Sequence, residues 1–478
     1  MANALMIDFG STYTKVVAVD LDAQLLLGCA QAPTTVKDLM VGLTEAMENL
    51  YAVTGKVAFD HKLACSSAAG GLRMVAIGFV KELTVEASRR AALGAGAKVV
   101  EVFSNGLDAM DIAQLQQIKP DVILLSGGTD GGNKAILLEN AKLLAASGLQ
   151  APVVIAGNRK AAPQAAELLA AAGVEAIITE NVLPQVDILN VEPAREAIRE
   201  VFMKRIVIAK GLDKAQAFVN QVLMPTPMAV LHAAKLLAEG TRDEEGLGDV
   251  VIVDVGGATT DLHSVAQPVT TGNTVVKGLP EPYAKRTVEG DLGIRHNALT
   301  ILEMAGAPKI LAQGGVPEAS IDLPAYIQLI AAMPRKVPDN PLEERIDLGL
   351  AKTATEVAMA RHAGTFEEVH FVDGKVRQLT GKDLTEVKAL IGTGGVFAYG
   401  GHGFEILRGA LFESRAPQSL RPRGPQMYLD SMYCLFAVGL LSQLAPTVAL
   451  RIAKKAMRSA ALGTDAERVP SGEASAAA

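Results

Sequence analysis

The sequence predicts a two-lobed α/β protein whose lobes are duplicated and whose first lobe carries an inserted, doubly wound parallel domain. Two strand–turn–strand units, one at the start of the chain and one past its middle, share a pattern of residues. Apolar strands alternate with helical segments between these units, as they do in parallel sheets. Only 4% of residues are aromatic although 49% are hydrophobic, and such an aliphatic core suits helices packed on parallel strands.

The two strand–turn–strand units lie at residues 4–19 and 250–265. In each, apolar residues lead into a glycine turn, and residues typical of strands follow it. When the units are aligned, both read Asp-x-Gly-small-x-x-Thr, beginning at Asp8 and at Asp254. An internal duplication explains this agreement better than two unrelated hairpins do.

Residues 72–189 form a separate pattern in which apolar strands alternate with helices, punctuated by Pro120 and Gly173. This is the pattern of βαβ units, so we predict a Rossmann- or flavodoxin-like domain inserted into the first lobe. The predicted division of the chain is 1–70, first part of the first lobe; 71–190, inserted domain; 191–248, return to the first lobe with a connecting helix; 249–458, second lobe; and 459–478, disordered tail.

The composition excludes several classes of protein. With 45 basic and 52 acidic residues the net charge is −7, and there is no basic stripe of the kind that binds nucleic acid. Cys29, Cys65 and Cys434 are too few and too scattered for a disulfide framework or a zinc site. Residues 431–450 carry no charge, but polar residues and a proline among them favour a buried helix over a membrane span. Because the first residues also lack the basic region of a signal peptide, we expect a cytoplasmic protein without nucleic-acid or membrane partners.

Each of the two turns has the residues of a phosphate-binding loop. Glycine lets backbone N–H groups approach an anion, and the hydroxyl residues add donors. Asp8 and Asp254 end the strands before the turns, and we predict that both act in catalysis and hold Mg²⁺ through water. Two such turns facing each other would clamp the β- and γ-phosphates of a nucleotide, although each alone is also compatible with an ordinary glycine hairpin. Lys15 is predicted either to reach a phosphate or to pair with Asp261 across the clamp.

A third glycine-rich turn follows the apolar residues 389–391 and would let a base and a ribose lie against the backbone. Alone, it is equally compatible with the start of a helix. The predicted nucleotide-binding residues are Gly10, Ser11, Thr12, Tyr13, Thr14 and Lys15 in the first turn, Gly256, Gly257, Ala258, Thr259 and Thr260 in the second, and Gly392, Thr393, Gly394 and Gly395 in the third.

Another glycine-rich loop follows a predicted strand inside the inserted domain. It precedes a helix with Asn133 near its start, which is the arrangement of an anion- or ligand-binding loop at the carboxyl end of a parallel strand. A tight turn before a capped helix explains the same residues. The candidate ligand loop consists of Gly127, Gly128, Thr129, Asp130, Gly131 and Gly132.

The order of these parts resembles the actin, Hsp70 and sugar-kinase superfamily of ATPases, whose two lobes are duplicated ribonuclease H-like domains. Residues 8–15 resemble its first phosphate motif, 254–261 its second and 392–395 its adenosine motif. Residues 227–239 and the apolar segment after Asp430 resemble the two helices that connect its lobes. The resemblance implies ATP and Mg²⁺ as cofactors.

Glu289 and Asp291 lie in a glycine-flanked turn after the second phosphate motif. In relatives of this fold an acidic or amide group near this point orients the attacking water, so the resemblance implies that catalytic role for Glu289. A solvated carboxylate in a turn is equally compatible with the sequence.

Four segments look like signatures of one family, the glutamate mutase (methylaspartate mutase) accessory proteins, also called MutL or GlmL proteins. They are residues 125–133, 254–261, 286–295 and 390–395, and the resemblance covers nearly the whole chain. It implies a slow ATPase that acts as a reactivating chaperone for an adenosylcobalamin-dependent mutase. Such a factor exchanges damaged cobalamin for intact coenzyme. The mutase is therefore the implied partner, and cobalamin is contacted only indirectly, through the mutase. Glutamate mutase and related amino mutases are all compatible with the sequence.

The inserted domain resembles a cobalamin-binding domain in its alternation of strands and helices. It lacks the Asp-x-His-x-x-Gly motif that ligates cobalt, since no histidine lies between His61 and His232. Mimicry of a small domain of the mutase is one interpretation, and a structural insertion is the other.

Two further functions compete with the chaperone. A small-molecule kinase of the same fold needs a catalytic base, usually an aspartate in a Gly-Asp context. An activator of a radical dehydratase needs cysteines that hold an iron–sulfur cluster, and the three cysteines here offer no such grouping. The kinase therefore stays open and the activator is nearly excluded.

Overall fold

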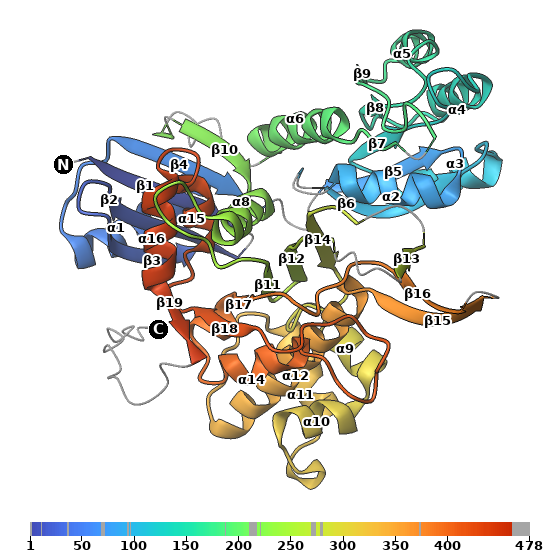
Figure 1. Ribbon diagram of the computed structural model, residues 1–478. Helices are drawn as coiled ribbons and strands as arrows, with labels where there is room; N and C mark the ends of the chain where they lie inside the picture. The colour runs from blue at the N-terminus through green and yellow to red at the C-terminus, as the bar shows by residue number, and fades with distance from the viewer. Residues whose placement is uncertain are drawn as a thin grey trace.

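The computed structural model confirms the predicted α/β fold class, with two lobes, an inserted domain and a pair of helices between the lobes (Figure 1). The predicted nucleotide-binding residue Ser11 and residues 461–478 of the predicted tail lie outside the described residues, and Ser459 ends the last strand. The structure describes residues 2–10, 12–35, 38–67, 72–92, 95, 97–186, 188–209, 218–219, 221–268, 274–277, 281–371 and 374–460.

The first lobe is built on a five-stranded sheet. Its elements are β1 (Asn3–Phe9), β2 (Tyr13–Asp20), β3 (Leu25–Pro33), α1 (Leu39–Thr54), β4 (His61–Ser66) and β10 (Gln221–Pro225). The strand order is β10-β4-β1-β2-β3, in which β1, β2 and β3 form an antiparallel meander and β4 and β10 run parallel to β1. Helix α1 packs on β3 and begins after Asp38, whose carboxylate accepts a hydrogen bond from the Met40 N–H at 3.0 Å.

The second lobe repeats this strand order. Its strands are β11 (Val250–Val255), β12 (Thr260–Val265), β14 (Ala284–Glu289), β17 (Ala389–Thr393), β18 (Gln426–Asp430) and β19 (Met457–Ser459). The order is β14-β12-β11-β17-β18-β19, again with an antiparallel meander followed by two strands parallel to its first member. Asp8 and Lys15 face each other across β1 and β2, and Asp254 and Asp261 occupy the same register positions in β11 and β12. The duplication therefore extends from the motif to the sheet topology.

The inserted domain has a parallel sheet covered by helices on both faces. Its elements are β5 (Leu72–Gly78), α2 (Lys81–Ala92), β6 (Ala97–Ser104), α3 (Ala109–Ile118), β7 (Val122–Leu125), α4 (Ala135–Ala146), β8 (Val153–Ile155), α5 (Ala162–Ala171) and β9 (Ala176–Ile178). Helix α6 (Glu192–Ala209) leads back to the first lobe and contacts α2 and β6 of this domain as well as β10. The strand order β6-β5-β7-β8-β9 is that of flavodoxin-like sheets. Met74 and Ala76 of β5 face a core shared with α2 and α6, whereas Val75 and Ile77 face the core beneath α3, α4 and α5.

The rest of the second lobe consists of helices and a small sheet. The helices are α9 (Ala298–Ala305), α10 (Ala307–Gly314), α11 (Leu323–Ala332), α12 (Pro341–His362), α13 (Gly395–Ala398) and α14 (Gly403–Leu407), with 3₁₀ turns at Glu318–Ser320 and Arg408–Ala410. The small sheet has the order β13 (Thr274–Val276), β16 (Gly374–Thr380) and β15 (Thr365–Phe371). Helix α12 starts at an Asn340 cap and is buried over most of its length, so it forms the centre of the lobe's hydrophobic core.

Helices α8 (Thr226–Glu239) and α15 (Leu435–Leu441) lie side by side between the lobes (Figure 1). Their side chains share one core with residues of β1 and β4 in the first lobe and of β11 and β17 in the second. The expectation of one buried helix over residues 431–450 is wrong in detail. The chain forms α15 and then α16 (Pro446–Ala456), because Pro446 has no N–H with which to continue the preceding helix.

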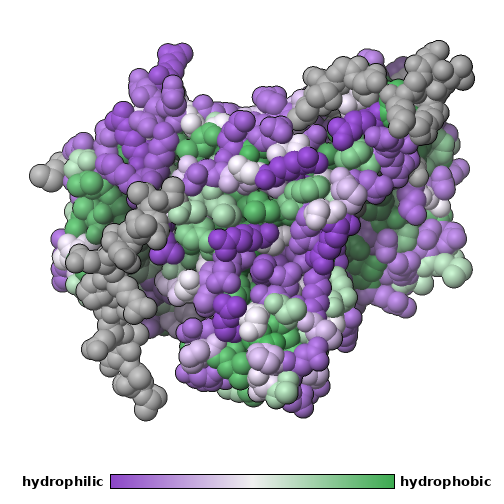
Figure 2. Space-filling model, turned by 60° about the horizontal axis from the view of Figure 1, so that its bottom comes forward, coloured by the Kyte–Doolittle hydropathy of each residue, from purple (hydrophilic) through white to green (hydrophobic). Residues whose placement is uncertain are grey.

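No helix within the described residues is long and apolar enough to cross a membrane. Within the uncharged segment the buried part is α15, every residue of which lies in the interior. Figure 2 shows a face of the molecule on which hydrophilic side chains predominate and apolar side chains form a band across the middle.

Candidate nucleotide site

A cavity of about 730 Å³ lies between the lobes, and all three predicted turns contribute to its walls. The turn residues that line it are Gly10, Thr12, Tyr13 and Lys15 from the first, Gly256, Gly257, Ala258 and Thr259 from the second, and Thr393 and Gly395 from the third. The fold therefore brings together residues that are far apart along the chain.

The first and second turns have the same local structure. The Gly10 N–H donates to the Tyr13 carbonyl at 3.1 Å, and the Gly256 N–H donates to the Thr259 carbonyl at 2.9 Å. A Cβ at position 10 would stand 2.4 Å from the Tyr13 oxygen, so the first turn requires glycine.

Two predicted binding residues lie behind the turns rather than in the cavity wall. The buried Thr14 hydroxyl contacts the Thr34 hydroxyl at 3.1 Å, and Thr34 in turn donates to the Gly10 carbonyl. The buried Thr260 hydroxyl donates to the Leu292 carbonyl at 2.7 Å. Both threonines thus brace the loops from inside each lobe.

Asp8 is buried at the carboxyl end of β1, where it also lines the cavity. Its carboxylate accepts hydrogen bonds from the Thr226 hydroxyl at 2.6 Å and from Lys15 Nζ at 3.2 Å, and the Cys65 thiol lies 3.6 Å away. Thr226 begins α8, so Asp8 joins the first turn to a connecting helix. Sequence reasoning missed Thr226, and the flanking Pro225 and Pro227 were the available sign of a helix start there.

Asp254 lines the same cavity from the second lobe. Burial, followed by the negative charge of Asp261, raises its pKa from 3.8 to about 7, while Lys15 acts in the opposite direction. Within the described part of the chain its carboxylate accepts no hydrogen bond. Asp254 is therefore an acceptor that faces the cavity and is poised to change protonation near neutral pH.

The predicted alternative that Lys15 pairs with Asp261 is wrong. Lys15 pairs with Asp8 in its own lobe. Asp261 is held by Arg286, whose Nη2 lies 2.7 Å from Oδ1, and by the Thr259 hydroxyl at 2.9 Å. The charged pairs Lys15–Asp8 and Arg286–Asp261 both line the cavity, one in each lobe. Arg286 lay within a signature segment but was not singled out.

The third turn is joined to the second connecting helix through Asp430. The Thr393 hydroxyl donates to the buried Asp430 carboxylate at 2.9 Å, and the same group accepts the N–H groups of Cys434 and Leu435 at the start of α15. Gly394 has φ of +107°, and a Cβ there would lie 2.5 Å from the Val255 carbonyl oxygen, so the strands approach closely at this point.

Glu289 is not among the residues that line the cavity. Its carboxylate pairs with Arg361 at 2.6 Å, and Asp291 accepts two hydrogen bonds from the same guanidinium at 2.8 and 2.9 Å. The pairing with Arg361 lowers the pKa of Asp291. Both acidic groups after the second motif are thus engaged by one arginine from α12.

The candidate ligand loop of the inserted domain is held by two buried asparagines. Asn158 Nδ2 donates to the Thr129 carbonyl at 2.6 Å, and Asn181 Nδ2 donates to the Gly128 carbonyl and to Asp130 Oδ1, both at 3.0 Å. Gly127, Gly131 and Gly132 complete the loop, which lies at the carboxyl edge of the parallel sheet and outside the lining of the cavity between the lobes. Its fixed geometry accords with the tight-turn interpretation as well as with a ligand loop.

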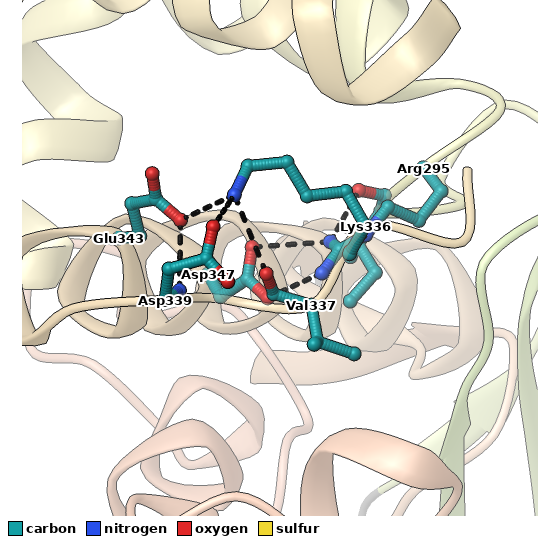
Figure 3. Close-up of polar contacts among 7 residues, drawn as sticks. Arg295, Lys336, Val337, Asp339, Glu343 and Asp347 are labelled. Atoms are coloured by element: carbon teal, nitrogen blue, oxygen red, sulfur yellow. Dashed lines mark hydrogen bonds and ion pairs between the residues drawn. The ribbon is translucent and has the colours of Figure 1, made fainter. Parts of the chain in front are cut away.

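Figure 3 shows a cluster of charged residues, of which Arg295, Lys336 and Asp347 line the cavity. Arg295 makes two hydrogen bonds to Asp347 of α12, at 3.0 and 2.5 Å, and its Nε donates to the Lys336 carbonyl. Lys336 Nζ lies 2.5 Å from Asp339 and 2.9 Å from Glu343. These contacts fix the segment before α12 against the second phosphate turn.

Replacing Asp347 by Asn is expected to lower the free energy of unfolding by about 2 kcal/mol, because it leaves a largely buried guanidinium without its anion. Asp339→Asn is the matched control, since Asp339 is 72% exposed and its pair is worth at most about 0.5 kcal/mol. Urea denaturation followed by circular dichroism measures both. Equal urea midpoints for the two variants would contradict the expectation that the Arg295–Asp347 pair stabilises the fold more than the Lys336–Asp339 pair does.

No group of three or more His, Cys, Asp or Glu side chains able to hold a metal lies within the described ranges. Asp8 and Asp254 nevertheless face one cavity from opposite lobes. Mg²⁺ keeps several waters and is usually bound by one or two carboxylates together with substrate phosphates. Two carboxylates beside two phosphate turns fit that requirement.

Two lobes with repeated sheets, a pair of connecting helices and glycine turns around a shared cavity define the actin, Hsp70 and sugar-kinase class of ATPase folds. A family model described as MutL protein matches residues 4–457. Protein MutL of Clostridium tetanomorphum is 47% identical over 456 residues, which cover 94% of this chain and 98% of that protein. The chain therefore belongs to the MutL family, and the resemblance of its motifs is confirmed.

Solved structures with detectable similarity are more distant. Component A of (R)-2-hydroxyglutaryl-CoA dehydratase from Acidaminococcus fermentans is 9% identical, with 95% of this chain and 99% of that one covered and a TM-score of 0.33. A glycerol dehydratase reactivase is 9% identical, with 92% and 99% covered and a TM-score of 0.36. Similarity of this extent bears on neither activity nor partner.

Proposed function

We propose that this protein is a slow, Mg²⁺-dependent ATPase that reactivates an adenosylcobalamin-dependent mutase by exchanging damaged cobalamin for intact coenzyme. The observation that carries the proposal is the pair of equivalent glycine turns that face one cavity, each preceded by an aspartate. Membership of the MutL family supports the choice of a mutase as the partner. Glutamate mutase and related amino mutases are the candidates.

In this proposal the phosphates lie between the two turns and the base lies toward residues 392–395. Lys15 neutralises phosphate charge, and Asp254 accepts a proton from the attacking water. Mg²⁺, when bound, would neutralise charge on the β- and γ-phosphates, and Asp8 and Asp254 would hold it through water. Glu289 is the weaker candidate for orienting water, because Arg361 holds its carboxylate.

The contacts of the site suggest how nucleotide state would reach the rest of the molecule. Asp8 binds Thr226 at the start of α8, and Thr393 binds Asp430, which caps α15. Both connecting helices are therefore attached to groups around the cavity. A change at the phosphates would alter how the helices pack, and with it the angle between the lobes and the grip on a bound mutase.

The small-molecule kinase is less well supported. Asp291 is the aspartate in a Gly-Asp context, and Arg361 holds it through two hydrogen bonds. A carboxylate fixed in this way, with a lowered pKa, is a poor general base for a substrate hydroxyl.

The proposal is tested by incubating the protein with a mutase that holds inactivated cobalamin, with and without Mg²⁺-ATP, while free cobalamin and mutase activity are followed. We expect release and recovery of activity only with ATP. Asp8→Ala is expected to abolish both, and Asp243→Ala, at an exposed position between α8 and β11 and outside the lining of the cavity, serves as the control. Hydrolysis without any release would favour the kinase, and a screen of small-molecule acceptors would follow.

A further inference from the structure

The ammonium group of Lys15 lies between a carboxylate and an aromatic ring at the wall of the cavity. Its Nζ atom is 3.2 Å from Asp8 Oδ2 and 3.8 Å from the centre of the Tyr433 ring, with the Phe436 ring farther away at 5.9 Å. A cation at this distance from a ring face is attracted to it. Lys15 is therefore held from two sides.

Tyr433 reaches this position through an unusual backbone conformation. Its φ is +50°, in the left-handed region that a bulky residue rarely adopts. The Tyr433 N–H donates to the Asp430 carbonyl at 3.2 Å, and the Asp430 carboxylate holds the N–H groups of Cys434 and Leu435. The surroundings thus impose the strain, and strain of this kind gathers at functional sites.

Tyr433 also lies at a junction between the lobes. It follows β18 of the second lobe and precedes α15, which packs against β1 and β4 of the first lobe. Lys15 belongs to β2 of the first lobe. The contact between ring and ammonium therefore joins the segment between β18 and α15 to the cavity-facing side of the first lobe.

We propose that Tyr433 is a positioning residue for Lys15, whose ring keeps the ammonium facing the terminal phosphate. The proposal rests on the proposed ATPase function. Without the ring, the ammonium would be held by Asp8, with only the more distant Phe436 ring beside it, and would turn toward that carboxylate. A cation–π contact is weaker than an ion pair, so the ring orients the charge without competing with a phosphate.

Steady-state ATP hydrolysis by Tyr433→Leu and Tyr433→Phe tests the proposal. We expect kcat to fall about tenfold in the Leu variant with less than about a threefold change in KM, and we expect Phe to recover most of the loss. Met432→Leu, at the exposed neighbouring position, is the control. A Leu variant with normal kcat, or a Phe variant as slow as Leu, would overturn the proposal.

A second measurement does not depend on hydrolysis. The nucleotide-free protein is treated with an amine-reactive acetylating reagent, and mass spectrometry measures the rate at which Lys15 is acetylated. This rate reports how firmly the ammonium is held. We expect the rate to rise about threefold or more in Tyr433→Leu and to stay near wild type in Tyr433→Phe. Equal rates in all three proteins would overturn the proposal. If the wild type hydrolysed no ATP, the proposed function would fail while this assay still decided the role of the ring.

Discussion

Replacing Asp254 by Asn is expected to slow ATP hydrolysis about a thousandfold at pH 8. The carboxylate faces the cavity, accepts no hydrogen bond within the described residues and has a pKa raised to about 7, so it accepts a proton at this pH. Asn has similar shape but takes no proton. Release of inorganic phosphate under saturating Mg²⁺-ATP measures the effect.

The same substitution is expected to stabilise the nucleotide-free protein. Burial, and then Asp261, raise the pKa of Asp254 in the folded state from 3.8 to about 7. Folding therefore favours the protonated form, and this group makes the free energy of unfolding fall as the pH rises from about 4 to about 7. Three pKa units correspond to at most about 4 kcal/mol at pH 8, which the neutral Asn recovers.

Thermal melts at pH 5 and pH 8 check this expectation. The gain should shrink by more than half at pH 5, where the folded wild type is already largely protonated at this position. Asp243→Asn, at an exposed position between α8 and β11, is the control. It should change neither the melting temperature nor the rate of hydrolysis. If the Asp254→Asn variant had the same melting temperature as the wild type at both pH values, the charged Asp254 carboxylate would not destabilise the folded state.

Replacing Gly439 by Ala is expected to destabilise the protein by about 2 kcal/mol. An added Cβ would stand 1.7 Å from the Ala229 carbonyl oxygen, where α15 crosses α8, and backbone cannot move aside cheaply. Alanine favours a helix by about 1 kcal/mol relative to glycine, but forcing the two helices apart at so short a distance costs about 3 kcal/mol, the upper end of the usual range, which leaves a net loss of about 2 kcal/mol. The midpoint of urea denaturation should therefore fall.

Gly424→Ala is the matched control, because an added Cβ there has no atom within 4 Å. Its midpoint should stay within experimental error of the wild type. Since both connecting helices are attached to residues that line the cavity, the proposed function predicts that Gly439→Ala also weakens the coupling of ATP hydrolysis to cobalamin release. An unchanged midpoint for Gly439→Ala would contradict the close packing of α8 and α15.

The parts of the fold that could be predicted are those indicated by residues close together in the sequence. The duplicated turns carry their own pattern around Asp8 and Asp254, and the inserted domain shows a regular alternation of strands and helices. The break between α15 and α16 had a local sign in Pro446, which the apolar composition of the segment obscured. Residue patterns at short range therefore specified the sheets better than the helix ends.

The partners of the site residues were not predictable, because they depend on contacts across the fold. Thr226 reaches Asp8 only when β10 has joined the first sheet, and Arg361 meets Glu289 only when α12 has packed beneath β14. Tyr433 has no sequence signal at all, since nothing in the segment indicates a left-handed tyrosine.

We propose that the two equivalent turns bind one nucleotide between them. A crystal structure with Mg²⁺ and a non-hydrolysable ATP analogue tests it most directly. We expect the triphosphate between the turns at Gly10 and Gly256, the metal near Asp8 and Asp254, and the base beside Gly394. Binding of the analogue elsewhere, or contact with only one of the two turns, would contradict it.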